Sequence, residues 1–227
     1  MKSQALALLL LASFLGFAQT ATAPAVALTA EPHHHLILEN EFVRVFQVEV
    51  LPNAETLLHQ HDHDYAFVTL GDSEVENDVV GKSPARLKLA DGESRFTSGK
   101  FAHVAKNLVA TPFRNVTMEF LRDAIPASTA ASDTALLPGE RLIFDKDGVR
   151  ATEIRLAAGA SLPRHTHTHP HLVIAVSDLD MRSEAEGKLF SEVHRKIGEV
   201  AWVPGGLTHT VANVGTSEAR YIALEFR

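Results

Sequence analysis

The 227-residue chain contains no cysteine, and this absence limits the chemistry available to it. It excludes disulfides, thiolate metal ligands, cysteine nucleophiles and iron–sulfur clusters, so any metal site must be built from nitrogen and oxygen donors. The sequence also lacks the Gly-x-Ser-x-Gly motif of serine hydrolases, the phosphate loop and the dinucleotide-binding fingerprint. A formal net charge of -7 without a basic stripe argues against nucleic acid as a partner.

The first residues have the pattern of a secretory signal peptide. Lys2 supplies a positive charge, residues 5–17 form an apolar run, and Gly16-Phe17-Ala18 offers a small-x-small cleavage site. We expect residues 1–18 to be the signal, with cleavage near residue 23 as the alternative, and the mature protein to be periplasmic or secreted. The run is shorter than the roughly 18 to 20 residues of a membrane span, so no stable span is expected after cleavage.

Residues 19–35 follow the signal and are rich in Ala, Thr and Pro, a composition typical of a tether. Three consecutive histidines, His33–His35, stand at its end. A short histidine run can bind metal loosely, but it is more often a solvated loop. We therefore expect this run to be a solvated loop.

The rest of the chain matches itself without a gap at a shift of 106 residues. The repeated unit is too long for one turn of a solenoid, so the simplest interpretation is two copies of one small domain. These domains are residues 36–122 and 138–227, joined by a small polar linker at 123–137. A domain of this size is marginal alone, so the two are expected to share an interface. The repeated histidine pairs are His59 and His165, His61 and His167, His63 and His169, and His103 and His209.

Each repeat has the rhythm of short strands. Residues 42–50 alternate between apolar and polar side chains, which is strand periodicity. Turn signals follow at Pro52-Asn53, at residues 71–73 and at residues 90–92. Neither half contains a convincing long amphipathic helix. This pattern predicts an all-β sandwich or barrel in each repeat.

The histidine pairs indicate metal sites. Residues two apart on a strand point to the same side, so His165 and His167 can face one ion together, and a third histidine from a neighbouring strand would complete a three-nitrogen site. Imidazole suits Fe, Mn, Co, Ni, Cu and Zn. By spacing, His63 and His169 are alternatives for a fourth ligand, unless a bulge or the kink at Pro170 turns them away.

The order of these residues resembles the cupin superfamily. The first cupin motif is a glycine, five residues, His-x-His, three or four residues, a glutamate and later a glycine. The second is a glycine, a Pro-x-Gly turn, two residues, a histidine, three residues and an asparagine. Because both repeats carry the pattern, the chain is similar to a bicupin. The resemblance implies two tandem antiparallel jelly-roll barrels, each with a transition metal in its mouth. The matching residues of the second half are Gly159, His165, His167, Gly198, Pro204, Gly206, His209 and Asn213.

The resemblance also implies the ligands of each site. In the second half, His171 occupies the family's glutamate position, which allows a four-histidine site in which His171 is a ligand or an acid–base group. In the first half Tyr65 occupies that position, and a tyrosine with a pKa near 10 is a reluctant ligand. That site is therefore expected to be three-histidine, weaker or empty. The implied metal ligands are His165, His167, His171 and His209 in the second half and His59, His61 and His103 in the first.

We take His171 and Tyr65 as candidate catalytic residues and a divalent Fe, Mn, Ni, Cu or Zn ion as the cofactor. Other side chains have structural interpretations. Trp202 and its counterpart Phe96 are predicted to be core aromatics, because such rings bury much apolar area. Two further predictions are salt bridges of Glu119 with Arg44 and of Glu225 with Arg150, and solvent exposure of Asp62 and Asp64.

Two functions from different classes fit these observations. The first is an exported metal-dependent oxidoreductase, dioxygenase-like, that acts on a small organic molecule. The second is a non-catalytic exported protein that binds metal or a small molecule. It is favoured by the first site, in which the Pro-x-Gly turn is eroded to Ser98-Gly99-Lys100, and by the lack of a clear active-site carboxylate. Related barrels pair through sheet edges, so a homodimer is a further expectation.

Overall fold

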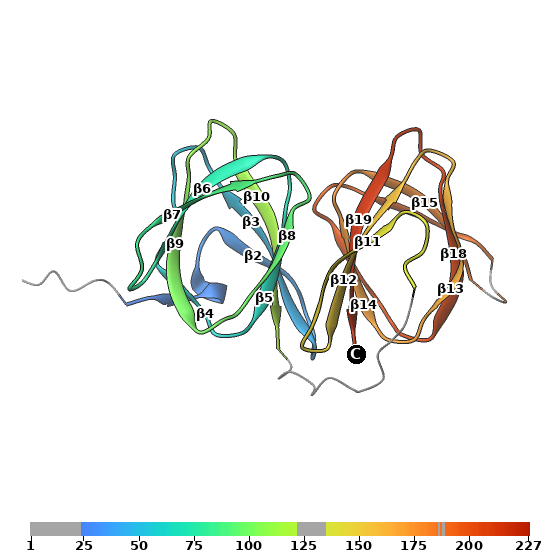
Figure 1. Cartoon of the computed structure of the whole chain (residues 1–227), viewed down its shortest axis with the longest axis horizontal. Helices are drawn as coiled ribbons and strands as arrows, with labels where there is room; N and C mark the ends of the chain where they lie inside the picture. The colour runs from blue at the N-terminus through green and yellow to red at the C-terminus, as the bar shows by residue number, and fades with distance from the viewer. Residues whose placement is uncertain (1–23, 122–134, 186, 188) are drawn as a thin grey trace, which may run out of the picture.

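The computed structural model describes residues 24–121, 135–185, 187 and 189–227, which form two β-barrels side by side (Figure 1). The predicted signal peptide and most of the predicted linker, residues 123–134, lie outside the described residues. No helix in the described part of the chain is long and apolar enough to cross a membrane. The all-β prediction is confirmed, since the described helical structure is a single 3₁₀ turn, η1 (Leu28–Ala30).

The first barrel is built from two five-stranded sheets, with the orders β1-β4-β9-β6-β7 and β2-β3-β10-β5-β8. Their strand pairs are antiparallel except for β1 and β4, which run parallel. The strands are β1 (Val26–Ala27), β2 (His34–Glu39), β3 (Val43–Val50), β4 (His59–His61), β5 (Tyr65–Thr69), β6 (Ser73–Val79), β7 (Ala85–Leu89), β8 (Ser94–Thr97), β9 (Phe101–Asn107) and β10 (Phe113–Phe120).

The second barrel repeats this topology with the sheet orders β11-β12-β19-β14-β17 and β13-β18-β15-β16. Every one of its strands except β13 begins 106 residues after its counterpart in β2–β10, so the internal repeat of the sequence is also a repeat of strands. The strands are β11 (Glu140–Lys146), β12 (Val149–Leu156), β13 (Ser161–His167), β14 (His171–Ala175), β15 (Leu179–Ala185), β16 (Ser191–Arg195), β17 (Val200–Val203), β18 (Leu207–Asn213) and β19 (Ala219–Phe226).

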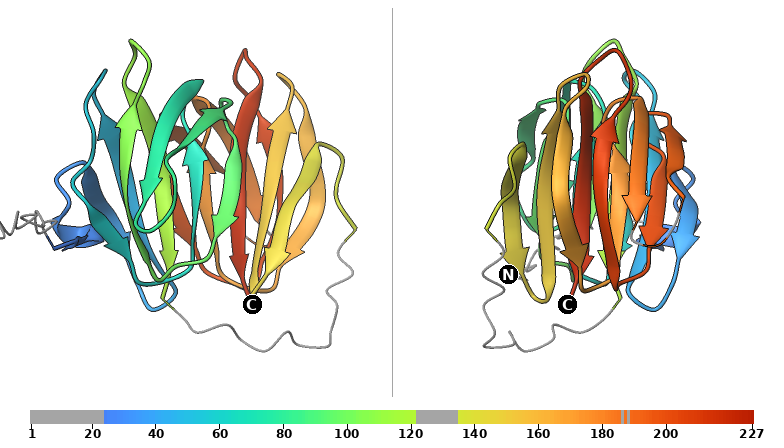
Figure 2. Two further views of the ribbon diagram at one scale, coloured as in Figure 1. Left: turned by 60° about the vertical axis from the view of Figure 1, so that its left-hand side comes forward. Right: turned by 90° about the vertical axis from the view of Figure 1, so that its right-hand side faces the viewer.

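The two barrels pack through the sheets that contain β3 and β12 (Figures 1 and 2). Neighbouring residues of a strand face opposite sides, so β3 presents Val43 and Val45 to the other barrel and Phe46 and Val48 to its own interior. The predicted shared interface is confirmed by one buried cluster that contains side chains from both repeats. Trp202 packs against this cluster, as predicted for a core aromatic. The buried members are Val43, Val45, Ala66, Val68, Leu70, Val116, Met118, Phe120, Val149, Ala151, Leu172, Ile174, Val176, Ile222, Leu224 and Phe226.

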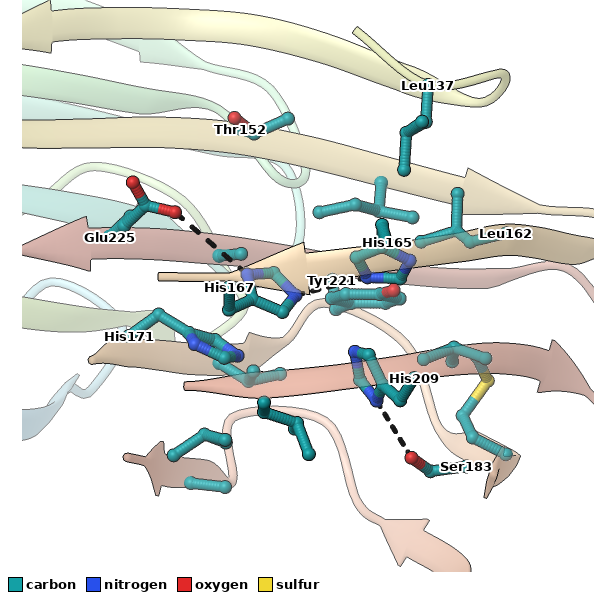
Figure 3. Close-up of a pocket in the computed structure, with 18 of the residues that line it drawn as sticks. Leu137, Thr152, Leu162, His165, His167, His171, Ser183, His209, Tyr221 and Glu225 are labelled. Atoms are coloured by element: carbon teal, nitrogen blue, oxygen red, sulfur yellow. Dashed lines mark hydrogen bonds and ion pairs between the residues drawn. The ribbon is translucent and has the colours of Figure 1, made fainter. Parts of the chain in front are cut away.

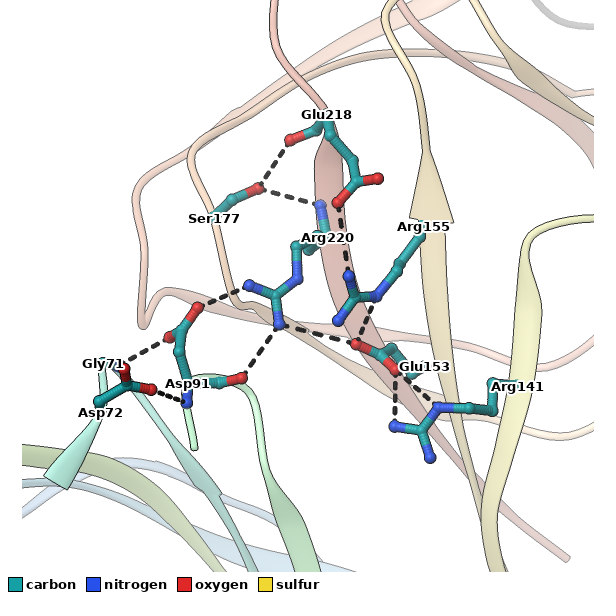
Figure 4. Close-up of polar contacts among 9 residues, drawn as sticks. All are labelled: Gly71, Asp72, Asp91, Arg141, Glu153, Arg155, Ser177, Glu218 and Arg220. Atoms are coloured by element: carbon teal, nitrogen blue, oxygen red, sulfur yellow. Dashed lines mark hydrogen bonds and ion pairs between the residues drawn. The ribbon is translucent and has the colours of Figure 1, made fainter. Parts of the chain in front are cut away.

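A polar network joins the barrels at the edge of this apolar interface (Figure 4). Arg220 of the second barrel donates to the Asp91 carboxylate of the first at 2.6 Å and to its carbonyl oxygen at 3.1 Å. Buried Glu153 accepts from the Nε atoms of Arg141 and Arg155, both at 2.9 Å. Burial alone would raise the pKa of Glu153, but these guanidinium groups outweigh it and lower the pKa. Nη2 of Arg220 also lies 3.7 Å from Oε1 of Glu153, so the bond between the barrels is connected to the charged cluster of the second barrel.

The segment before β2 differs from the predicted tether. Its described part, residues 24–35, belongs to the first barrel: β1 pairs with β4, and Leu28 is buried in the apolar interior. The expectation of a solvated histidine run is wrong for His34, which begins β2 and is only 9% exposed. Composition misled here because a short strand needs only backbone hydrogen bonds and one apolar side chain to pack.

Candidate metal centres

Three histidines meet inside the first barrel. His59 and His61 lie on β4 and point to the same side, and His103 on β9 is the direct cross-strand partner of His59. One nitrogen from each lies within 4.8 Å of the others, and the Nε2 atoms of His61 and His103 are 3.2 Å apart. All three side chains are buried. The cross-strand register thus brings together residues that are more than 40 positions apart in the sequence.

Hydrogen bonds orient two of these rings. Nδ1 of His59 donates to the carbonyl oxygen of Leu57 at 2.8 Å, and Nδ1 of His103 donates to Oδ1 of Asn77 at 2.5 Å. Both acceptors are oxygens, so the Nε2 atoms carry the free lone pairs. Nε2 of His59 is buried without any hydrogen-bond partner. A buried acceptor without a hydrogen-bond partner, beside two further imidazole nitrogens, is suited to bind a transition-metal ion.

The second barrel contains a matching group (Figure 3). His165 and His167 lie on β13, and His209 on β18 is the cross-strand partner of His165. One nitrogen from each lies within 4.8 Å of the others, with 3.1 Å between the Nε2 atoms of His165 and His167. Nδ1 of His165 donates to the carbonyl oxygen of Pro163 at 2.7 Å, and Nδ1 of His209 pairs with Oγ of Ser183 at 2.9 Å. Nε2 of His209 is again buried without a partner.

Both groups favour neutral imidazole, the form that binds metal. Burial and then the neighbouring imidazoles lower the pKa of His61 to about 2 and that of His103 to about 3. Burial is also the main reason why the pKa of His59 falls to about 4. In the second barrel the same causes lower the pKa of His167 to about 3 and that of His209 to about 4.

The two candidate catalytic residues occupy equivalent places. The His171 ring stacks on His167, with centroids 4.0 Å apart, and the Tyr65 ring stacks on His61, with centroids 4.1 Å apart. Among the described residues, the two groups of converging nitrogens consist of three histidines each, and His171 is not a member. The structure therefore places His171 against the flat face of a triad ring. Burial lowers the pKa of His171 to about 4 and raises that of Tyr65 to about 12, so both rings are neutral.

The alternative fourth ligands, His63 and His169, lie outside both triads. Strands β4 and β13 end at His61 and His167, so the two-residue alternation stops before either alternative. Glycines at the matched positions 99 and 205 allow the backbone to approach closely at this turn. A Cβ on Gly205 would lie 2.6 Å from the carbonyl oxygen of Thr168, and a Cβ on Gly99 would collide with the carbonyl oxygen of His63. The chain is thus redirected by close backbone packing immediately after each His-x-His pair.

The predictions for the carboxylates near the sites are confirmed in part. Asp62 is exposed as predicted, but Asp64 is half-buried and accepts from the backbone N–H of Gly99 at 2.8 Å. The predicted salt bridge of Glu119 with Arg44 is present, with Nη1 3.3 Å from Oε2.

Glu225, the counterpart of Glu119, lies inside the second barrel beside the triad. Its Oε2 is 4.0 Å from Nδ1 of His167 (Figure 3), and its Oε1 accepts from Nε of Arg227 at 3.3 Å. At this distance the two groups form no hydrogen bond, but a carboxylate beside a ligating imidazole would offset part of the charge of an ion bound there. The repetition of Glu119 and Glu225 on the inward face of a strand was the sequence signal for this position.

Sequence reasoning missed one pair in the first barrel. Oε2 of Glu31 accepts from Nδ1 of His34 at 2.5 Å, and the His34 ring centroid lies 4.8 Å from that of His59. Glu31 is 1% exposed. Burial would raise its pKa, but the hydrogen bond from His34 and those from the backbone of Leu57 and His33 outweigh burial and lower it. No spacing rule connects this pair to the His-x-His motif.

The cavities around the two triads differ in size. The cavity of the second barrel is about 400 Å³, and that of the first is about 80 Å³. Larger side chains fill the first: Phe67 and Leu87 stand where the second barrel has Val173 and Val193. The larger cavity has mostly apolar walls with the histidine triad on one side, and its lining includes Leu137, Ile154, Leu162, Leu179, Met181 and Val211.

Comparisons with solved structures identify the fold. No protein-family model and no curated protein matches the sequence. AerE from Microcystis aeruginosa is similar with a TM-score of 0.58 and 15% identity over 87% of this chain and 98% of that chain. A cupin 2 conserved barrel domain protein from Leptotrichia buccalis gives 0.56 and 13% over 86% and 88%. A variant of salicylate 1,2-dioxygenase from Pseudoaminobacter salicylatoxidans, in complex with gentisate, gives 0.60 and 10% over 86% and 74%.

These neighbours and the two barrels define the class: the chain has the fold of the cupin superfamily. It carries that fold twice, as a bicupin does, and each copy holds a histidine triad suited to a transition metal. At these identities the likeness concerns the fold. The chemistry must be argued from the residues of this chain.

Proposed function

We propose that the protein is an exported, metal-dependent oxidoreductase of the dioxygenase type that acts on a small organic molecule in its second barrel. The observation that carries the proposal is the triad of His165, His167 and His209 in the wall of a cavity of about 400 Å³. That volume suits a small organic ligand. The export part of the proposal rests on the signal-like pattern of the first residues.

The second-barrel triad would hold the metal through its Nε2 atoms. Three neutral donors leave coordination positions open, and the ion, when bound there, supplies Lewis acidity and redox chemistry with O2. Ser183 fixes the ring of His209 from behind through its hydrogen bond to Nδ1, and the Glu225 carboxylate lies 4.0 Å from Nδ1 of His167. His171 holds one face of the His167 ring. These contacts keep the donor atoms in place before any substrate enters.

The chain's own side chains also define the class of substrate. Apolar walls exclude water and bind the hydrocarbon part of a ligand, while Arg150, Arg195 and Glu140 supply polar groups in the same lining. A small, partly apolar molecule with an oxygen function that reaches the metal matches this arrangement. The salicylate 1,2-dioxygenase neighbour, solved with gentisate, makes small aromatic hydroxy acids the first class to test.

The experiment is a comparison of the untagged chain with His167→Ala. Bound metal per chain is measured by mass spectrometry after loading with Fe(II), Mn(II), Ni(II), Cu(II) or Zn(II), and O2 consumption is then followed with salicylate, gentisate and related acids. We expect one equivalent less metal and no O2 consumption in the variant. O2 consumption that is equal in both chains would overturn the proposal.

A second candidate function is a non-catalytic binder of metal or a small molecule. Neither described triad contains a carboxylate ligand, and this favours it. A binder would show ligand-induced thermal stabilisation with every metal and no turnover with any of them.

A further inference from the structure

We infer that the two metal sites have different roles: the first is a buried, structural metal site that fastens the N-terminal segment, residues 26–34, to its barrel through Glu31 and His34. This inference rests on the proposed metal binding and extends it, because it removes the first site from substrate chemistry. Four observations support it.

The first observation is the lack of room. The cavity around the first triad is about 80 Å³, against about 400 Å³ in the second barrel. Phe67, Leu87 and Leu89 occupy the space that would receive an organic ligand. An ion with one or two small ligands fits such a space, whereas an aromatic acid does not.

The second observation is a chain of hydrogen bonds between the segment and a ligand of the site. Oε1 of Glu31 accepts from the backbone N–H of Leu57 at 3.1 Å, and the carbonyl oxygen of Leu57 accepts from Nδ1 of His59 at 2.8 Å. The backbone N–H of Val26 also donates to the carbonyl oxygen of Leu58 at 2.9 Å. The peptide groups that orient His59 are therefore held by the N-terminal segment.

The third observation is the buried Glu31–His34 pair beside the triad. Oε2 of Glu31 accepts from Nδ1 of His34 at 2.5 Å and from the backbone N–H of His33 at 2.9 Å. The His34 ring borders the small cavity and lies 4.8 Å from the His59 ring, between centroids. A buried carboxylate near three neutral imidazoles offsets the charge of a divalent ion, which favours retention of the metal.

The fourth observation is that the pair is specific to the first barrel. The positions 106 residues later carry Leu137 and Glu140, and both line the larger cavity. The segment that packs against the first triad thus has, at the matched positions of the second barrel, side chains that line the larger cavity. The two copies have diverged at the residues that decide access to the metal.

The test separates the sites with the matched variants His167→Ala, which keeps the first triad, and His61→Ala, which keeps the second. Each chain is studied with and without Zn(II) alone, by hydrogen–deuterium exchange of residues 24–41 and by thermal unfolding. In His167→Ala we expect Zn(II) to slow exchange of this segment at least about tenfold and to raise Tm by about 5 to 10 °C. In His61→Ala, Zn(II) should leave exchange in the segment unchanged.

Glu31→Gln, added to His167→Ala, tests the carboxylate. We expect it to weaken Zn(II) binding about 10- to 100-fold, while Glu49→Gln, an exposed glutamate of the same barrel, leaves affinity unchanged. If a variant does not fold, exchange of the wild-type segment with and without Zn(II) decides the question directly. Equal exchange with and without bound metal would overturn the inference, as would a His167→Ala chain that binds no Zn(II). Zn(II) bound by His61→Ala would show in the same experiment that the proposed second site stands independently.

Discussion

The imidazole ring of His171 lies flat against that of His167, with an interplanar angle of 26° and 4.0 Å between centroids. The phenol ring of Tyr65 lies on His61 in the same way, at 16° and 4.1 Å. One sequence position therefore supports the second histidine of the His-x-His pair in both barrels, with two different ring types. What the copies share is the stacking, which needs a flat ring and no metal-binding atom.

The stacking role predicts the behaviour of His171→Phe. A phenyl ring keeps the flat contact but has no nitrogen, so we expect metal per chain to remain unchanged after loading. His171→Ala loses the contact and should cost about 0.5 to 1.5 kcal/mol of stability beyond the loss of buried area. Metal analysis and urea unfolding of both variants provide the measurement. Loss of one metal equivalent in His171→Phe would instead make His171 a ligand.

The triads predict which histidines matter for metal. His165→Ala should remove one equivalent of bound metal per chain, because two imidazoles cannot fill the site. His169→Ala should remove none, since this residue follows the end of β13 and lies outside the triad. Mass spectrometry of the two variants after identical loading distinguishes them. Retention of full metal in His165→Ala would show that the nitrogens in the triad are not the ligands.

The depressed pKa values predict acid lability of the metal-free protein. An unfolded histidine has a pKa near 6.5, whereas burial lowers the pKa of His103 to about 3 and that of His167 to about 3 in the folded state. Below pH 6.5 the unfolded chain therefore binds more protons, and stability falls as the pH decreases from about 6.5 toward about 3. Each such histidine contributes about 1.4 kcal/mol per pH unit in this window.

Urea unfolding of the metal-free chain at pH 7.5, 6.5 and 5.5 measures this dependence. The double variant His61→Gln/His103→Gln lacks two of the titrating groups and should show a shallower loss between pH 6.5 and 5.5. Identical slopes for the two chains would contradict the assigned cause. Glu31 does not interfere, because its pKa is lowered from 4.5 and it titrates below this range.

The difference between the cavities predicts the effect of Val173→Phe. Phe67 is the counterpart of Val173 in the small cavity, so the substitution should close part of the large one. We expect the variant to keep its metal and to lose binding of small aromatic acids at least tenfold, measured by calorimetry. Val214→Phe, at an exposed position, serves as the control and should bind as the wild type does. Unchanged binding in Val173→Phe would place the ligand elsewhere.

Much of the architecture follows from local properties of the sequence. Alternation of apolar and polar residues, as in β3, and frequent turn signals are sufficient for an all-β prediction, and the repeat at 106 residues predicts two barrels. The pairing of His59 with His61 and of His165 with His167 follows from the two-residue period of a strand. These features depend on residues that are close together in the chain, so they can be predicted from the sequence alone.

The tertiary structure alone decided the features that depend on distant residues. The stacking of His171 on His167 requires the end of one strand to meet the start of the next, and the contact of Glu225 with His167 requires the cross-barrel register of β19. The burial of Glu31 and His34 depends on a parallel pairing between β1 and β4 that composition does not reveal. Composition, spacing and periodicity therefore determined the all-β fold and the histidine pairs, while the resemblance to the cupin superfamily implied the third histidine of each triad. The different sizes of the two cavities arise from packing, because free volume is set by side chains that meet only when the barrels fold.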